Sequence, residues 1–286
     1  MKKEPLLSLD LYYKIIRVFE QNGWEIPRND AGNESAFNRF CDRLSMLEKE
    51  EQELVVDLAM RFTKINGNDY LMLIKQLLNI LQEKHSEVFV NTKYYILPLI
   101  AQKDIMKTKS SKFVWYYFRD DSVKFCPLFY KKQLVYFDTP NASQLNSVKQ
   151  DEKIILVDDY IGSGETAVEA LQWLTKANSI DSQQIIVLSI AAQQLGIKYI
   201  MDTTGALVYS LYLFQRGISD YYGEYNKTQS ISIMQQIEAK MRVEEKFKFG
   251  YNRSEALISL IRTPNNTFPV FWLKRPKYGD APFPRD

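Results

Sequence analysis

Residues that most metal sites and nucleophilic active sites use are scarce in this sequence. Its 286 residues include two cysteines, Cys41 and Cys126, and one histidine, His85. A structural zinc site usually takes four Cys or His ligands, which these three residues cannot supply. A Ser-His-Asp triad would depend on His85, and the chain has no nucleophile elbow. Catalysis here has to use carboxylates, lysine, tyrosine, backbone amides or a metal ion held by oxygen.

Long hydrophobic segments and an excess of one charge are also missing. The longest apolar run, Tyr94–Ala101, is interrupted by Pro98, whereas a membrane-spanning helix needs about 20 apolar residues. No apolar stretch of a secretory signal follows Met1–Pro5, so we expect a cytoplasmic protein with no membrane partner. The 37 basic and 35 acidic residues give a net charge of +2, which is too balanced to indicate nucleic-acid binding.

Apolar residues recur at helical spacing through the first 90 residues. Leu11, Ile15, Val18 and Phe19, for example, share one face of a helix. Ser35 is placed to cap a second helix, and Gly67-Asn68 interrupts the pattern. We therefore expect residues 1–90 to form an N-terminal helical region.

From Asn91 onward, short aromatic and β-branched runs indicate strands. Strands are predicted at residues 94–100, 113–118, 134–137, 153–157, 185–190, 206–214, 256–261 and 270–273, and helices at 166–174, 192–203 and about 230–246. Their alternation predicts an α/β fold with a parallel sheet flanked by helices. We expect this core to cover residues 91–273 and a proline-containing tail to follow at 274–286.

The segment Ile154–Thr166 carries a chemical pattern. Lys153–Val157 has the continuous apolar character of a central parallel strand, and it delivers Asp158 and Asp159 to the carboxyl edge of the sheet, where open α/β folds bind ligands. A loop with two glycines and two hydroxyls follows and opens a helix, whose first N–H groups form an anion site. A sugar with vicinal hydroxyls and a 5-phosphate would satisfy both features.

This order of apolar strand, two acids, glycine-and-hydroxyl loop and helix resembles the signature of type I phosphoribosyltransferases. The resemblance implies a phosphoribosyltransferase-like fold in which Asp158 and Asp159 contact the ribose hydroxyls. The residues it places around the 5-phosphate are Gly162, Ser163, Gly164, Glu165 and Thr166. It also implies displacement at the sugar C1 of phosphoribosyl pyrophosphate or a nucleotide. Mg²⁺ would hold the pyrophosphate, with Asp158 and Asp159 as candidate carboxylate ligands.

Three departures from that signature affect the expected function. Glu165 stands where the family usually has a neutral or basic residue, so its side chain must point away from a phosphate. Gly162 replaces the acid that purine-specific members carry, which disfavours purine acceptors. No glycine occurs over the 94 residues 68–161, where average usage would give roughly six or seven, so the usual pyrophosphate loop is not visible.

The best substitute for the pyrophosphate loop is the segment Lys107–Lys112. Lys109, Ser110 and Ser111 are candidates for binding an anion, with Lys109 offsetting the charge of the leaving group. Three lysines in an exposed loop are equally ordinary, so both interpretations stay open at this point.

A second resemblance concerns the C-terminal segment Gly250–Pro269. It is similar to a divergent branch of phosphoribosyltransferase-like proteins proposed to act in bacterial conflict systems, including retron-linked ones, and the similarity covers residues 35–273. The Pro264–Thr267 run is first of all a turn, because Asn tolerates left-handed conformations. Alternatively, Asn265 or Asn266 reaches the site and reads a base.

Three functional hypotheses follow from these residues and resemblances. The first is a phosphoribosyltransferase or nucleotide glycosidase with Asp158, Asp159 and Lys109 as catalytic residues, acting in bacterial defence. The second is a nucleotide-sensing module that has lost catalysis. The third is an effector held inactive by a protein or nucleic-acid regulator.

Overall fold

The computed structural model describes residues 7–27, 35–140, 145, 148–178 and 180–285. Within it the chain forms two compact units, and each is described here by itself. Unit 1 combines Met1–Ile65 with Gln215–Asp286, and unit 2 is the continuous segment Asn66–Phe214. This division differs from the boundaries at residues 90 and 273 that the sequence pattern suggested, because the last predicted strands fold with the N-terminal helices.

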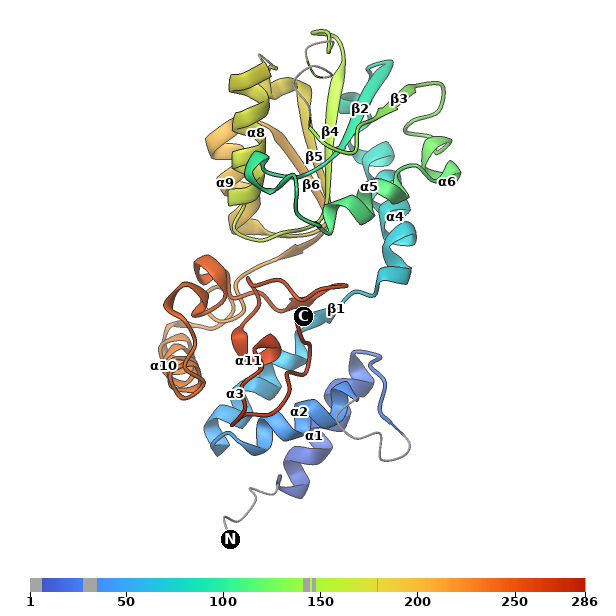
Figure 1. Cartoon of the computed structure of the whole chain (residues 1–286). Helices are drawn as coiled ribbons and strands as arrows, with labels where there is room; N and C mark the ends of the chain where they lie inside the picture. The colour runs from blue at the N-terminus through green and yellow to red at the C-terminus, as the bar shows by residue number, and fades with distance from the viewer. Residues whose placement is uncertain (1–6, 28–34, 141–144, 146–147, 179, 286) are drawn as a thin grey trace. The chain divides into compact units, whose positions relative to one another are not determined.

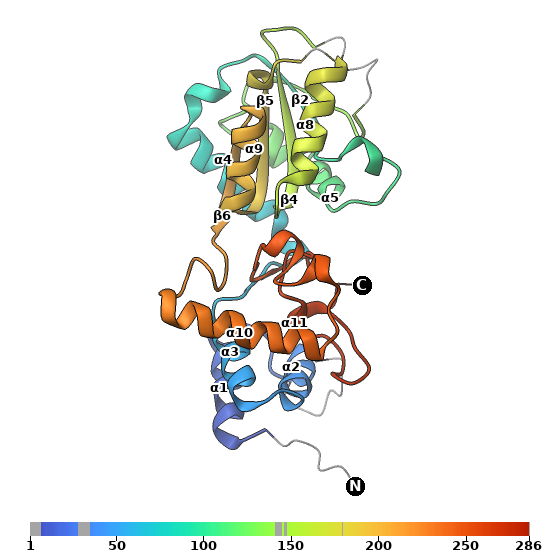
Figure 2. The ribbon, with the colours of Figure 1, turned by 90° about the vertical axis from the view of Figure 1, so that its left-hand side faces the viewer.

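Unit 2 is a parallel α/β sheet between two layers of helices (Figure 1). The five strands run in the order β3-β2-β4-β5-β6, and every neighbouring pair is parallel. Their bounds are β2 Lys93–Pro98, β3 Gln133–Tyr136, β4 Lys153–Ile161, β5 Ile185–Gln193 and β6 Leu207–Phe214. The helices are α4 Tyr70–Lys84, α5 Ser111–Tyr117, α6 Asp121–Lys124, α8 Glu165–Asn178 and α9 Gln194–Thr204. Figures 1 and 2 show α8 and α9 on one face of the sheet and α4 and α5 on the other.

The sheet order creates a switch point between β2 and β4. The chain runs from β2 outward to β3, then returns to the other side of β2 as β4 and continues through β5 to β6. At such a point the loops leave neighbouring strands in opposite directions, and a crevice opens at the carboxyl ends of the strands. Strand β4 is the central strand, and β5, in which every residue is buried, lies beside it.

Two segments predicted as strands are helices. Residues 113–118 lie largely in α5. Its buried residues Ser111, Val114 and Trp115 and the buried C-cap Phe118 repeat at helical spacing, and Trp115 Nε1 donates to the Ile96 carbonyl of β2 at 3.0 Å. Residues 270–273 fall mostly in α11 (Pro269–Trp272), where Pro269 starts the helix. Aromatic and β-branched content alone misled both assignments. The predicted strand at 256–261 is reduced to β7, Ile258–Ser259.

Unit 1 packs helices from both ends of the chain around one apolar core. They are α1 Leu9–Gln21, α2 Ala36–Ser45, α3 Lys49–Met60, α10 Glu224–Lys240 and α11, and a short parallel pair joins β1 (Thr63–Lys64) to β7. Phe62 stacks on Phe283 and tilts against Phe271, so N- and C-terminal segments share the core. Ser35 caps α2 as predicted, accepting from the Phe37 and Asn38 amides. In the described residues no helix is long and apolar enough to cross a membrane.

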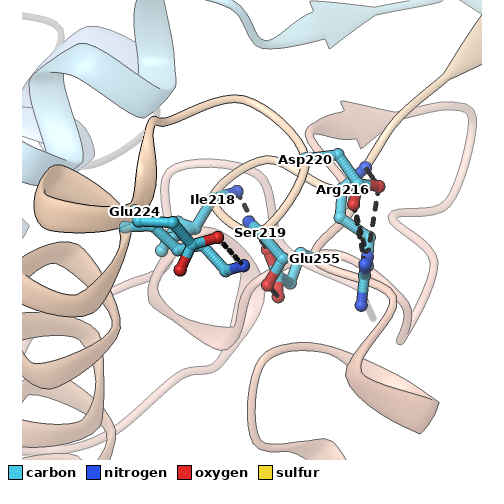
Figure 3. Close-up of polar contacts among 7 residues, drawn as sticks. Arg216, Ile218, Ser219, Asp220, Glu224 and Glu255 are labelled. Atoms are coloured by element: carbon cyan, nitrogen blue, oxygen red, sulfur yellow. Dashed lines mark hydrogen bonds and ion pairs between the residues drawn. The ribbon is translucent and has the colours of Figure 1, made fainter.

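The chain segment that follows β6 is fixed by a buried carboxylate. Glu255 accepts hydrogen bonds from the Ile218 and Ser219 amides at 2.9 and 2.7 Å, and from the Ser219 hydroxyl. Arg216 and Asp220 face each other beside it and pair at 2.7 Å (Figure 3). These bonds give residues 216–220 a defined conformation within unit 1.

A buried guanidinium holds the C-terminal segment of unit 1. Arg43 on α2 is fully buried and donates to the carbonyls of Val270, Leu273 and Tyr278 at 3.1, 2.8 and 2.8 Å. Burial lowers the pKa of Arg43 to about 10, against the opposing influence of Asp280. The proline-containing tail is therefore anchored, at Tyr278, to a helix more than 200 residues earlier in the sequence.

Replacing this guanidinium tests how far unit 1 depends on it. Arg43→Met keeps most of the buried volume but removes every donor to these carbonyls, and we expect a loss of about 3–5 kcal/mol in the free energy of unfolding. Urea unfolding measures the loss, with the exposed Arg17→Met on α1 as the matched control, for which a change within about 0.5 kcal/mol is expected. Equal effects of the two substitutions would show that Arg43 does not hold the tail.

Candidate functional site

Strand β4 brings Asp158 and Asp159 to the switch point, as the sequence predicted. Pairing between β2 and β4 ends at Pro98 and Val157, whereas β4 remains paired with β5 through Asp158 and on to Ile161. The two acids therefore begin where the β2 side of β4 becomes open. Although successive side chains of a strand point to opposite faces, the two carboxyl groups stay close enough to interact, through a side-chain hydrogen bond and through their charges.

Asp159 is held on the α4 and α5 face of the sheet. Its side chain is buried, with 4% of the residue exposed. Oδ2 accepts from the Tyr70 hydroxyl at 3.0 Å, and Oδ1 accepts from the Ser110 hydroxyl at 2.7 Å. Tyr70 begins α4 and Ser110 immediately precedes α5, so this carboxylate joins three elements. Both of its oxygens are occupied by the protein's own hydroxyls.

Asp158 lies at the same level as Ser189 of β5 and Ser210 of β6. It is half-buried, and its Oδ1 accepts from the Asp159 backbone amide at 2.9 Å. Burial, together with the neighbouring Asp159 carboxylate, raises the pKa of Asp158 well above its ordinary value, and the Lys109 charge opposes that shift. Ionising Asp158 is therefore costly, and Asp158 is the acid of the pair that a ligand can contact.

The loop from β2 to α5 (residues 99–110) carries charges that the sequence had assigned to an anion site. Lys107 and Lys109 each pair with Asp104 at 2.6 Å. Asp104 is buried, which alone would raise its pKa, but hydrogen bonds from the two ammonium groups outweigh burial and lower it. Asp104 could not be identified from the sequence, because a single acid in a lysine-rich loop gives no signal of its own. The catalytic role of Lys109 stays a prediction.

Ser110, at the end of this loop, and Ser111, at the start of α5, were both expected to bind an anion, but their contacts differ from that expectation. Ser110 donates to Asp159, so its hydroxyl positions an acid, and its phosphate role stays untested. Ser111 is 1% exposed, and its Oγ has no hydrogen-bond partner in the described part of the chain. Lys103 in the same loop pairs with Glu169 of α8 at 2.6 Å and links the loop to the helix that follows the glycines.

The glycine loop, residues 162–164, is packed against α9. Gly164 has a φ of +84°, and the Val168 amide donates to its carbonyl at 2.9 Å, so α8 begins there. A Cβ on Gly164 would lie 2.7 Å from the Gly196 carbonyl oxygen, and a Cβ on Gly196 would lie 2.1 Å from the Gly162 carbonyl oxygen. The resemblance placed Gly162 and Gly164 around a 5-phosphate, and Gly196 shows that the loop also needs space against α9.

The start of α8 has the features of an anion site. The first N–H groups of a helix have no partner within the helix and carry partial positive charge. Ser163 is half-buried beside them, and Thr166 is exposed in the first turn. Glu165 is half-buried at the first helical position, where its carboxylate is a competitor for the same positive end. The structure thus keeps the predicted loop, with its acidic departure, at the carboxyl edge of the sheet.

Asn265 and Asn266 belong to unit 1. The Asn266 side chain donates to the Ser254 hydroxyl at 2.8 Å and to the Tyr251 carbonyl at 3.3 Å, and the Asn265 carbonyl accepts from the Tyr251 amide. These bonds fix a turn in which Gly250 passes directly against the Asn266 backbone. The acidic pair belongs to unit 2, and the base-reading role of the two asparagines stays a prediction.

The residues around the acidic pair fit a substrate-carried Mg²⁺ better than a metal cage made by the protein. Across the described ranges, no group of three His, Cys, Asp or Glu side chains could hold a metal. Asp159 has both oxygens engaged by hydroxyls, which leaves Asp158 as the available carboxylate. Mg²⁺ is commonly bound by one or two carboxylates together with substrate phosphates and water, so a single available acid is compatible with it.

The glycine packing predicts a sharp difference between two substitutions. Gly196→Ala places a Cβ against the Gly162 carbonyl and must displace the loop, so we expect a loss of roughly 1–3 kcal/mol in stability. Gly223→Ala is the matched control, since nothing lies within 4 Å of its added Cβ and its φ is −62°. Thermal unfolding of both variants measures the difference, and similar melting temperatures would contradict the packing.

The raised pKa of Asp158 predicts that replacing this acid with a neutral residue increases stability, by an amount that depends on pH. The native state holds this proton at pH values where the unfolded chain, with an ordinary pKa near 3.9, has released it, so stability falls as pH rises through that window. Asp158→Asn removes the fall, and its melting temperature should exceed that of wild type at neutral pH and match it in acid. Each 1 kcal/mol gained raises Tm by about 2–4 °C.

Melting curves at a series of pH values check this expectation. Asp202→Asn on the exposed surface of α9 is the control and should follow the wild-type profile. A lower Tm for Asp158→Asn at neutral pH would show that the Asp158 charge stabilises the fold.

Comparison with known proteins supplies the family. A model of the family PRTase-CE matches residues 38–283. The search of curated proteins found no match. Among solved structures, orotate phosphoribosyltransferase from Aeropyrum pernix is 13% identical, with a TM-score of 0.28, and the match covers 48% of this chain and 69% of that one.

Two other solved structures are similar at the same low level. A hypoxanthine-guanine-xanthine phosphoribosyltransferase is 13% identical, with a TM-score of 0.28, over 52% of this chain and 76% of its own. AQ2163 protein from Aquifex aeolicus is 13% identical, with a TM-score of 0.29, over 75% and 88%. The family match is more extensive than the acidic strand and glycine loop, since it includes most of both compact units. This chain therefore belongs to the PRTase-CE family.

Proposed function

We propose that this chain binds the ribose 5-phosphate moiety of phosphoribosyl pyrophosphate or a nucleotide and acts on a bond at the sugar C1. The observation that supports this most is the placement of Asp158 and the start of α8 at one switch point, joined by the glycine loop. A carboxylate accepts hydrogen bonds from sugar hydroxyls, and a helix start binds phosphate. Membership of the PRTase-CE family agrees with this chemistry.

The two acids have different roles in this proposal. Asp158 contacts the ribose hydroxyls and stabilises the positive charge that develops at the ring, because its carboxylate is half-buried and not engaged by the hydroxyls that hold Asp159. Asp159 acts as a positioning residue, fixed by Tyr70 and Ser110. The phosphate is held by the backbone N–H groups of residues 163–166 and the hydroxyls of Ser163 and Thr166.

In this proposal the β2–α5 loop and Mg²⁺ offset the negative charge of the leaving group. Lys109 is near enough to Asp158 to influence its pKa, and it is paired with Asp104 rather than free. Mg²⁺, when bound with Asp158 and the substrate, supplies neutralising charge on the pyrophosphate. The chain itself contributes by holding Lys109 and Asp158 near each other at the switch point.

A binding module without catalysis is the second candidate, and the Asp104 pairs favour it. Two of the three lysines in Lys107–Lys112 already pair with one buried acid, which offsets part of the positive charge that a leaving pyrophosphate would need. A module of this kind would sense a nucleotide or be regulated by a protein or nucleic-acid partner. The pyrophosphate-release assay with a panel of candidate bases separates the two, since only the enzyme turns over after binding phosphoribosyl pyrophosphate.

The biological setting we propose is an effector in bacterial defence, of the kind the retron-linked branch represents. The support for this is the sequence resemblance in Gly250–Pro269, a segment inside the matched family region. Growth of cells that express the chain with and without an intact acidic pair tests it, because an effector that consumes nucleotides slows growth only when its site is active.

Thr166 offers the cleanest test of the phosphate site. Thr166→Ala removes one hydroxyl donor and keeps the backbone N–H groups and the helix dipole. A hydrogen bond to a charged group is worth about 1.5–3 kcal/mol, so affinity for ribose 5-phosphate should fall by roughly 10- to 100-fold. Isothermal calorimetry with ribose 5-phosphate and phosphoribosyl pyrophosphate, with and without Mg²⁺, measures it.

The control is Thr228→Ala, an exposed threonine near the start of α10 in unit 1, which should leave both affinities unchanged. Unchanged phosphate affinity in Thr166→Ala, while wild type binds measurably, would remove the glycine loop from the phosphate site.

A further inference from the structure

The positive charge of this chain is concentrated in one segment of unit 2. Residues 103–132, which run from the β2–α5 loop to the residue before β3, contain eight basic and three acidic side chains, a net charge of +5. The rest of the chain has 29 basic and 32 acidic side chains, a net charge of −3. The balanced total therefore hides a local excess, and a local excess of positive charge attracts a polyanion.

The three acids of this segment are already engaged within it. Asp104 is buried and pairs with two lysines of the β2–α5 loop at 2.6 Å. Asp121 pairs with Lys124 at 3.3 Å. Asp120 caps α6, where it accepts from the amide and the hydroxyl of Ser122 at 2.8 and 2.6 Å.

Other cations of the segment have no carboxylate partner among the described residues. The ion pairs of the segment use four of its lysines. Arg119 and Lys131 are exposed and lie against aromatic rings instead. Arg119 Cζ is 5.3 Å from the Trp115 ring centroid, and Lys131 Nζ is 5.4 Å from that of Tyr130. Their charges are available to an outside ligand.

Aromatic side chains are exposed between these cations. Phe113 and Tyr116, three positions apart on α5, are 51% and 69% exposed, so they share its outer face. Phe125 and Tyr130 are 71% and 60% exposed. All sixteen phenylalanines of the chain lie in its described part, and only Phe113 and Phe125 are exposed. Rings kept in water beside cations provide a surface for stacking.

This surface begins beside the candidate site. Ser110, which donates to Asp159 at 2.7 Å, immediately precedes α5, and Phe113 follows three positions later. Figure 1 shows α5 and α6 next to each other in unit 2. A long ligand bound along these two helices would therefore have one part close to the acidic pair.

A single strand of nucleic acid has the chemistry that fits this surface. Its phosphates pair with exposed cations, and its unstacked bases present flat faces to aromatic rings. A duplex offers phosphates but encloses its base faces, and an acidic peptide would use the cations alone. A membrane would meet both cations and rings, but α5 and α6, with seven and four residues, are too short to bury a continuous apolar face in it.

We propose that the α5–α6 surface binds single-stranded nucleic acid, RNA or DNA. The surface consists of four rings and two cations: Phe113, Tyr116, Phe125, Tyr130, Arg119 and Lys131. The proposal goes beyond the proposed function and does not depend on it, because no residue of the acidic pair or the glycine loop takes part.

Fluorescence anisotropy tests the stacking. The probes are a single strand of about 16 nucleotides with a 5′-hydroxyl and a 3′-fluorophore, made as RNA and as DNA, and the DNA duplex of the same sequence. Wild type should bind at least one single strand more tightly than the duplex. Tyr116→Ala should weaken that binding by roughly 5- to 150-fold, the loss of one stacked base. Tyr225→Ala, at an 83% exposed tyrosine of α10 in unit 1, is the matched control and should bind like wild type.

The salt dependence tests the phosphate contacts. Lys131→Gln removes one cation, so the slope of log affinity against log salt concentration should become shallower by about 0.7 for a single strand. Lys198→Gln on α9, whose side chain is 79% exposed, is the control and should keep the wild-type slope. Because these substitutions are at the surface, melting temperatures should match that of wild type, which separates lost binding from lost folding.

Two variants distinguish this surface from the phosphate site. Tyr116→Ala should bind ribose 5-phosphate like wild type in calorimetry, and Thr166→Ala should bind the oligonucleotide like wild type. Failure of the oligonucleotide to bind would leave the ribose 5-phosphate result unaffected, so the two proposals fail independently.

Three results would overturn the proposal. They are a wild-type chain that binds neither single strand at low salt, a Tyr116→Ala variant that binds like wild type or loses no more affinity than Tyr225→Ala, and a wild-type chain that cosediments with phosphatidylserine vesicles in place of binding oligonucleotides. The last result would assign the surface to a membrane.

Discussion

The carboxylate of Asp159 is the contact on which the candidate site depends. A buried charge is tolerated only where hydrogen bonds replace the water it has lost, and here Tyr70 and Ser110 supply them. Those hydroxyls come from the start of α4 and from the residue before α5, so one carboxylate ties two helices to the end of β4. With Asp159 held in this way, its neighbour Asp158 is the carboxylate that the Tyr70 and Ser110 hydroxyls leave available to a ligand.

The other parts of the site are held in place by close packing and by an ion pair. The glycine loop turns from β4 into α8 and can lie against α9 only because Gly164 and Gly196 carry no side chains. The β2–α5 loop ends at Ser110, and Lys103 links it to α8 through Glu169. An acid with a raised pKa, a helix start and a charged loop thereby meet at one switch point, an arrangement that costs stability and is typical of functional sites.

The sequence was sufficient for the parts of the fold that depend on local pattern. The strand, the acids, the loop and the helix at 153–178 all occur in the predicted order, because a buried apolar run followed by glycines has few other structures. Residues 113–118 were assigned to a strand from their aromatic content, although the spacing of Val114, Trp115 and Phe118 already indicated a helix.

What the sequence could not provide are the partners that come from far along the chain. Ser110 was expected to bind phosphate, but it donates to a residue 49 positions later. Tyr70, which lies 89 positions before Asp159, had no motif to distinguish it. The same limit applies to unit 1, where Arg43 binds carbonyls more than 200 residues away and joins the two ends of the chain. No period or spacing rule records such contacts.

A crystal structure of the chain with phosphoribosyl pyrophosphate and Mg²⁺ tests the central claim most directly. The account predicts the 5-phosphate on the backbone N–H groups of residues 163–166, the ribose hydroxyls on Asp158, and Asp159 still bonded to Tyr70 and Ser110. A ligand whose ribose hydroxyls contact Asp159 with those two bonds broken, or whose phosphate lies away from the glycine loop, would contradict it.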